Sequence, residues 1–204
     1  MSSCALALFA LLLTLPAVAQ NGSHPIAPAI MLEDQFQKPH YLPGPVGDVI
    51  VLIYGDRQSA TANQQVGAAL HVLFHPSAQG QPPAQASRAP VRPIANWPAA
   101  VPLPDVKVVP IACVGKVPGL VASMVRSQIR SRSPDLPVCL DFTDTMKQYY
   151  GLARGVTNLA VIDTQGRVRC LAHGEVQPSR LNELERYLEL LRLEARDVPR
   201  QPRQ

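Results

Sequence analysis

The first residues able to do chemistry form a polar turn after an uninterrupted apolar run. Residues 49–54 are all apolar or aromatic, and Gly55-Asp56-Arg57-Gln58-Ser59 follows them directly. A strand that ends at such a turn and leads into a helix brings unpaired N–H groups to the carboxyl edge of a sheet. These N–H groups and the Arg57 guanidinium favour negative charge. We therefore expect Asp56, Arg57 and Ser59 to form a binding corner, defined as residues 55–59, for a small anionic ligand or a polypeptide.

The same corner also suits a purely structural role. The Asp56 carboxylate or the Ser59 hydroxyl can accept hydrogen bonds from the first helical N–H groups. In that arrangement Arg57 is solvated or pairs with Asp56, as surface charges commonly do. The corner contains no cysteine and so offers no thiolate. The sequence leaves both interpretations open.

Two further groups of residues could carry chemistry. His71 and His75 are four residues apart, which places both imidazoles on one helix face. They are weak metal candidates, because no third ligand is evident, and we expect neither a metal nor another cofactor. Cys113 is a weak candidate for a displaced catalytic thiol, with Lys116 the only nearby group that lowers a thiol pKa. The alternative for every cysteine is simple packing, since free cysteine is among the most buried residue types.

The N-terminus indicates the compartment. Residues 5–15 are apolar and lead to Pro16-Ala-Val-Ala19, a small-x-small site. We predict a signal peptide over residues 1–19, although the first three residues contain no Lys or Arg. The mature protein is then exported, periplasmic or secreted, and not membrane-bound; an uncleaved N-terminal anchor is the alternative. The net charge of +4 comes without a basic patch interleaved with aromatics, which argues against nucleic-acid binding.

Residues 20–204 are enough for one domain with a full core. Strands are predicted at residues 49–54, 106–113 and 136–142, and a hairpin at 157–172. The helices are expected to run from about Ser59 to Phe74, from near Gly119 and from near Pro178. In the second helix we expect five apolar residues to face inward and three arginines to form a basic face: Leu120, Val121, Met124, Val125 and Ile129, and Arg126, Arg130 and Arg132.

A proline-rich segment interrupts this order. Residues 76–105 repeat Pro, Gly, Gln and Ser and include Trp97, the only tryptophan. Loops of this length inside a domain are uncommon and are usually functional or disordered. We expect the segment to be an insertion that Trp97 attaches to the body and that lies over the corner. The polar tail at residues 197–204 is expected to be frayed.

The order of elements resembles the thioredoxin-like superfamily in its redoxin form. Five stretches carry this resemblance: residues 32–39, 49–54, 136–141, 146–152 and 159–168. It implies a three-layer α/β/α sandwich with a mixed central sheet, covering about residues 30–193. It also makes the strands of Cys113 and Cys139 neighbours, so a disulfide between them is conceivable, although adjacent parallel strands are a poor geometry for one.

The departures from this family bear on function. Its catalytic cysteines belong at the helix start, where this sequence has Asp56 to Ser59, and its cis-proline should fall near Val156 and Thr157. Neither feature is present. The chain therefore resembles exported thioredoxin-like proteins without redox cysteines, and we predict a non-catalytic binding or accessory module. The alternatives are a thiol oxidoreductase or peroxidase that uses Cys113 or Cys139, and a scaffold that docks a partner around Trp97.

Overall fold

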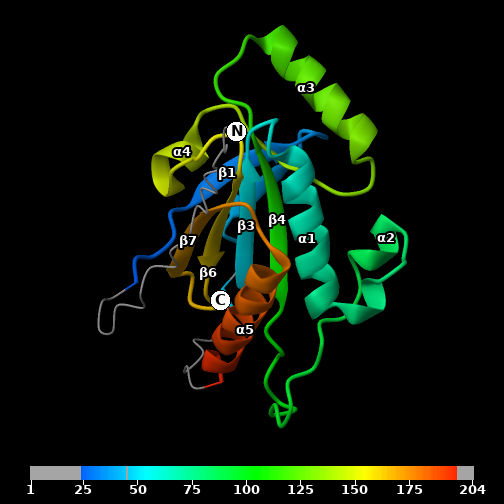
Figure 1. Cartoon of the computed structure of the whole chain (residues 1–204), viewed down its shortest axis with the longest axis vertical. Coiled ribbons are helices and arrows are strands. Elements are labelled where there is room, and N and C mark those ends of the chain that lie inside the picture. The colour runs from blue at the N-terminus through cyan, green and yellow to red at the C-terminus, as the bar shows by residue number, and fades with distance from the viewer. Residues whose placement is uncertain (1–23, 45, 197–204) are drawn as a thin grey trace, which may run out of the picture.

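The computed structural model describes residues 24–44 and 46–196 (Figure 1). The predicted signal peptide, Cys4 and the predicted frayed tail lie outside these residues. The strands are β1 Ile30–Asp34, β2 Pro39–Leu42, β3 Val49–Gly55, β4 Val106–Cys113, β5 Cys139–Asp141, β6 Thr157–Ile162 and β7 Val168–Gly174. The helices are α1 Ala60–Phe74, the 3-10 turn η1 Pro76–Ala78, α2 Pro83–Ala86, α3 Gly119–Arg132, α4 Thr145–Tyr150 and α5 Pro178–Glu194.

The seven strands form one mixed sheet in the order β2-β1-β5-β4-β3-β6-β7. β3 lies near the centre, parallel to β4 and antiparallel to β6. All seven residues of β3 are buried, as expected for a strand covered on both faces. The predicted fold class, a mixed sheet between helical layers, is confirmed.

Alternate residues of β3 enter two hydrophobic cores. Val49, Val51 and Ile53 pack with α1 and α5 on one face. Ile50, Leu52 and Tyr54 face the other side of the sheet, where they pack with α4 and the N-terminal strands. The side-chain period of a strand therefore divides the molecule into the layers visible in Figure 1. None of the described helices is both long enough and apolar enough to span a membrane.

The insertion at residues 76–105 does not lie over the corner, so that prediction was wrong. It begins at the C-terminal end of α1, and the corner is at the N-terminal end. Fifteen helical residues separate the two by about 22 Å. Figure 1 shows α2 beside the lower end of α1, away from the start of that helix.

Arg92 attaches the insertion to the body through polar contacts, whereas the Trp97 indole N–H bonds within the insertion. The Trp97 indole donates to the Val101 carbonyl within the insertion itself. The Arg92 backbone N–H donates to the Phe74 carbonyl over 2.7 Å, and its guanidinium lies over the Phe74 ring and pairs with Glu185. The insertion is therefore held against the end of α1 and against α5 at the half-buried Glu185.

Arg192 of α5 makes a second set of contacts between the insertion and the body of the protein. Its side chain is 0 % exposed, and its guanidinium donates to the carbonyl oxygens of Pro104 and Arg92 and to the Glu189 carboxylate, over 2.8–2.9 Å. The buried guanidinium is well satisfied, because each of its three nitrogens donates a hydrogen bond. Two carbonyls of the insertion therefore depend on one side chain of the last helix.

The predicted orientation of α3 was wrong in part. Leu120, Val121 and Met124 are exposed, at 76 %, 39 % and 64 %. Two arginines of the predicted basic face point toward the body instead: Arg126 pairs with Glu33, and Arg130 donates to the Gln35 carbonyl. The arginine stems therefore take part of the contact that the apolar residues were expected to make.

Candidate functional site

Asp56 organises the corner through its carboxylate. One oxygen accepts the N–H groups of Gln58 at 3.0 Å and Ser59 at 3.3 Å. The other accepts the N–H of Gly155 at 2.9 Å, from the loop that precedes β6. The side chain thus satisfies two donors of the turn that precedes α1 and joins two segments about a hundred residues apart in sequence. This geometry matches the structural role that the sequence also allowed for Asp56, in which its carboxylate accepts hydrogen bonds from N–H groups of the chain itself.

Ser59 is turned into the molecule. It is 1 % exposed, and its hydroxyl donates to the Asp56 carbonyl. The Asn63 side-chain amide donates to the same hydroxyl at 3.4 Å. We predicted Ser59 as a ligand contact, but in this structure the side chain has no surface to offer an external ligand. Its physical role is to fill the space between Gly55 and the first turn of α1.

Arg57 and Arg154 are the charged groups at the surface of the corner. They are the sequence neighbours of Asp56 and Gly155, the two residues joined by a hydrogen bond. Both are exposed, and within the described part of the chain neither side chain makes a hydrogen bond or an ion pair. Gln58, also exposed, places its side-chain oxygen against Gly155. These three residues form a cationic rim, defined as Arg57, Gln58 and Arg154.

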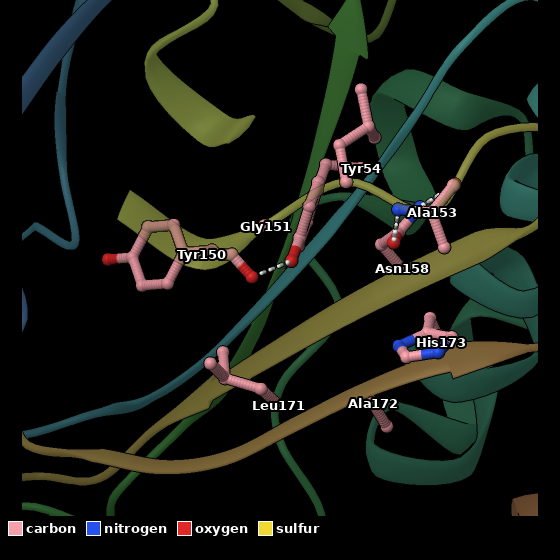
Figure 2. A pocket seen from close by; sticks show the side chains of 9 residues that line it. Tyr54, Tyr150, Gly151, Ala153, Asn158, Leu171, Ala172 and His173 are labelled. Carbon is pink, nitrogen blue, oxygen red and sulfur yellow. Dashed lines mark hydrogen bonds between the residues drawn. The ribbon is translucent and has the colours of Figure 1, made fainter. Parts of the chain in front are cut away.

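Asn158 fixes the loop that carries Arg154, and sequence analysis missed it. Its side chain accepts the Ala153 N–H at 2.8 Å and donates to the carbonyls of Ala153 and Val156, at 2.9 and 3.0 Å. Figure 2 shows the bonds between Asn158 and Ala153. Asparagine in a strand is unusual enough to mark such a site, because its amide competes with the backbone for partners.

Cys113 lies close to the corner but is poorly suited to nucleophilic chemistry. Burial, with the negative charge of Asp141 next in importance, raises the pKa of its thiol to about 12. The charges of Asp56 and Asp144 act in the same direction, while a hydrogen bond with the Gly55 backbone opposes them. A reactive thiol needs the reverse surroundings, with cations or free helix N–H groups close by.

The other thiols are similarly protected. Burial raises the pKa of Cys139 to about 12, with a contribution from Asp34, and burial also raises the pKa of Cys170. Among the described residues all three cysteines are free thiols, so the possible Cys113–Cys139 disulfide is not formed in this structure. The register explains this, because Cys139 lies opposite Ile111 and Cys113 opposite Asp141, two positions apart on parallel strands.

His71 and His75 support the insertion. Their rings stack with centroids 4.3 Å apart. His71 Nε2 bonds the Ala86 carbonyl, while His75 bonds the His71 carbonyl through Nδ1 and the Asp105 carboxylate through Nε2. Both ring nitrogens of His75 already have oxygen partners within the chain, so neither is directed at a metal site. No group of three metal-ligating side chains occurs among residues 24–44 and 46–196.

The comparisons with known proteins concern the fold. No protein-family model matches the sequence, and no curated protein is similar to it. A putative protein disulfide isomerase from Bacteroides thetaiotaomicron superimposes with a TM-score of 0.51 at 13 % identity, over 82 % of this chain and 88 % of that one. A DsbF homologue from Corynebacterium diphtheriae gives 0.50 at 14 % identity, over 84 % and 91 %. The fold is thioredoxin-like.

Within this thioredoxin-like, redoxin-type fold, the corner occupies a defined place. It lies at the carboxyl end of a central strand and the start of the helix that follows, and it faces the loop before the β6–β7 hairpin. The sequence has a carboxylate where the resemblance expects a thiol, and Val156-Thr157 where it expects a cis-proline. What the corner can do in this structure is bind through charge and hydrogen bonds.

Proposed function

We propose that this protein is an exported thioredoxin-like domain that binds a partner without thiol catalysis. The observation that carries the proposal is the Asp56 carboxylate at the start of α1, which accepts N–H groups from Gln58, Ser59 and Gly155. In a thiol enzyme, such N–H groups stabilise the catalytic thiolate. Here they already have an anion that belongs to the chain.

The alternative, a displaced thiol enzyme, finds little support. Cys113 and Cys139 each have a thiol pKa raised to about 12. At pH 8 such a thiol is ionised in about one molecule in ten thousand. The scaffold alternative around Trp97 has no specific support either, because its indole N–H is used within the insertion. Export rests on the apolar run and the small-x-small site of residues 5–19.

The cationic rim indicates what kind of partner the corner accepts. Arg57 and Arg154 are exposed and without ion pairs in the described chain, and each is the sequence neighbour of one partner of the Asp56–Gly155 hydrogen bond. The N–H groups of Gln58, Ser59 and Gly155 are occupied by the Asp56 carboxylate and are not available to an outside anion, so the exposed guanidinium groups are what the corner offers a partner. We infer that the partner is an acidic segment of another protein, which lies across the rim.

Thiol reactivity tests the absence of catalysis. We expect the native protein to show no thiol that reacts rapidly with Ellman's reagent at pH 8, and rates at Cys113 and Cys139 about a thousandfold below those in urea. Insulin reduction by dithiothreitol should proceed no faster with the protein than without it. Turnover that disappears in Cys113→Ser would overturn the proposal and support the displaced-thiol enzyme.

Binding of a fluorescein-labelled oligoglutamate at low salt tests the cationic rim. Arg57→Ala and Arg154→Ala should each weaken binding about two- to fivefold, the range for an exposed charge pair, and should reduce its salt dependence. Arg132→Ala, which removes an exposed arginine of α3, is the matched control and should have no such effect. If all three variants weaken binding equally, the attraction is only that of the net charge, and the rim is not the site.

A further inference from the structure

A separate cavity of about 490 Å³ lies beside the loop that carries Arg154. Its lining includes Tyr54 of β3, Ala153 of the loop, Asn158 of β6, and Leu171 and His173 of β7. Sites for small molecules usually have volumes of roughly 300–1,000 Å³. This cavity is therefore large enough for a ligand of one or two aromatic rings.

The strand register puts three of these side chains in one row. Tyr54 lies opposite Asn158, and Asn158 lies opposite His173. Tyr54 belongs to the core that packs with α4, so the row is on the face of the sheet opposite α1 and α5. Figure 2 shows Leu171 and His173 pointing from β7 toward the loop, with Ala172 pointing away. The cavity is thus distinct from the corner, which belongs to the start of α1.

The walls of the cavity are already ordered. The Tyr54 hydroxyl donates to the Tyr150 carbonyl at 3.1 Å, and Tyr54 is 2 % exposed. Asn158, also 2 % exposed, uses its whole amide to hold Ala153 and Val156. A ligand that enters therefore has few side chains to order, which reduces the entropic cost of binding.

Besides these ordered walls, the lining offers a ligand the aliphatic side chain of Leu171 and the imidazole of His173. Leu171 is 43 % exposed, a large value for an apolar side chain in a strand. His173 is exposed and makes no side-chain hydrogen bond within the described chain, so its imidazole is available as a donor. The lining includes no Asp or Glu, and the exposed Arg154 follows Ala153 directly. Neutral or negative ligands are therefore favoured over cations.

We propose that this cavity binds a small aromatic molecule that carries one carboxylate. Its ring lies against Leu171, whose exposed apolar surface is then removed from water, while the buried Tyr54 keeps the wall behind it in place. Its carboxylate accepts a hydrogen bond from His173 at the open side of the cavity. The proposal goes beyond partner binding at the corner and does not depend on it.

The test is a titration of the ¹⁵N-labelled protein with 2-naphthoate, followed by amide chemical shifts. We expect saturable changes that concentrate at Ala153, Leu171 and His173. Leu171→Trp, which fills the cavity from an exposed position, should weaken binding at least about tenfold. Leu190→Trp, at a leucine of α5 that is 57 % exposed, is the control and should bind as the parent does.

A neutral ligand of the same shape, 2-naphthamide, tests the hydrogen bond from His173 separately from the fit of the ring. The parent protein should bind 2-naphthoate about tenfold more tightly than 2-naphthamide, because a hydrogen bond to a charged acceptor is the stronger one. In His173→Ala the two ligands should bind alike. Equal affinities in the parent would overturn the assignment of the carboxylate. Shift changes spread over the whole surface, or binding unchanged in Leu171→Trp, would overturn the site itself.

Discussion

Replacement of Arg192 by methionine should lower the free energy of unfolding by about 3–5 kcal/mol, the range for removal of one partner of a buried charged network. Methionine keeps much of the apolar stem but none of the five N–H donors. The carbonyls of Pro104 and Arg92 would lose their donor, and Glu189 would lose one of its two arginine partners. Urea unfolding followed by circular dichroism measures the effect.

A matched control separates this effect from the loss of any arginine. Arg186→Met changes an exposed arginine of the same helix and should alter stability by no more than about 0.5 kcal/mol. Limited proteolysis gives a second readout, since Arg192→Met should make the insertion at residues 76–105 sensitive to cleavage. If both variants unfold at the same urea concentration, Arg192 does not attach the insertion to α5.

Replacement of Gly55 by alanine should destabilise the protein by about 2–3 kcal/mol, as expected for overpacking in a filled interior. A Cβ atom at this position would lie 2.1 Å from the Ser59 hydroxyl oxygen and 2.8 Å from the Asn63 side-chain nitrogen. Gly55 is a residue of β3 without a positive φ, so the requirement is for space and not for an unusual backbone. Thermal and urea unfolding both report the loss.

Two further variants make this prediction specific. Gly67→Ala in the middle of α1 should stabilise the protein by about 0.5–1 kcal/mol, because alanine is the better helix former. Its Cβ would make ordinary contacts at 3.6 Å with Ile53 and Val108. Ser59→Gly in the Gly55→Ala background removes the closer of the two clashes and leaves the one with the end of the Asn63 side chain, so it should recover at least half of the loss. A Gly55→Ala protein as stable as the parent would show that the corner rearranges freely.

The fold was predictable because several local signals agreed. The apolar run at residues 49–54, the helical spacing that ends at Phe74 and the hairpin around Gly166 each indicated one element. Their order then allowed few topologies, since parallel strands need crossover helices of a preferred hand. β3 is the clearest case, because a strand apolar at every position must be covered on both faces, as the structure shows.

The position of the insertion was not predictable from its own residues. Prolines, glutamines and serines indicate a loop but do not say where it goes. Its destination depends on Arg192, which is a hundred residues beyond Arg92 in the chain. In α3, apolar residues occur on both sides of the helix, and the contact with the body also uses arginine stems. Periodicity alone could not choose between the two faces.

The strand–turn–helix geometry of the corner was predicted correctly, but the hydrogen bonds within it were not. A turn after a strand is a local feature, whereas the hydrogen bond from Gly155 to Asp56 joins residues 99 positions apart. The sequence showed that a carboxylate was present and that a cysteine was absent. It could not show that the carboxylate turns inward to satisfy the chain's own N–H groups, which makes Arg57 and Arg154 the charged surface.

The hydrogen bond between Asp56 and Gly155 contains no group that the redox conditions around the protein could oxidise or reduce. In a domain that carries an active-site disulfide, the reduction potential and the folding free energy are linked, because the two oxidation states differ in stability. Here a carboxylate, which neither gains nor loses electrons, joins the helix start to the loop before β6. We therefore expect the geometry at Arg57 and Arg154, and the partner binding proposed there, to be the same in oxidising and reducing conditions.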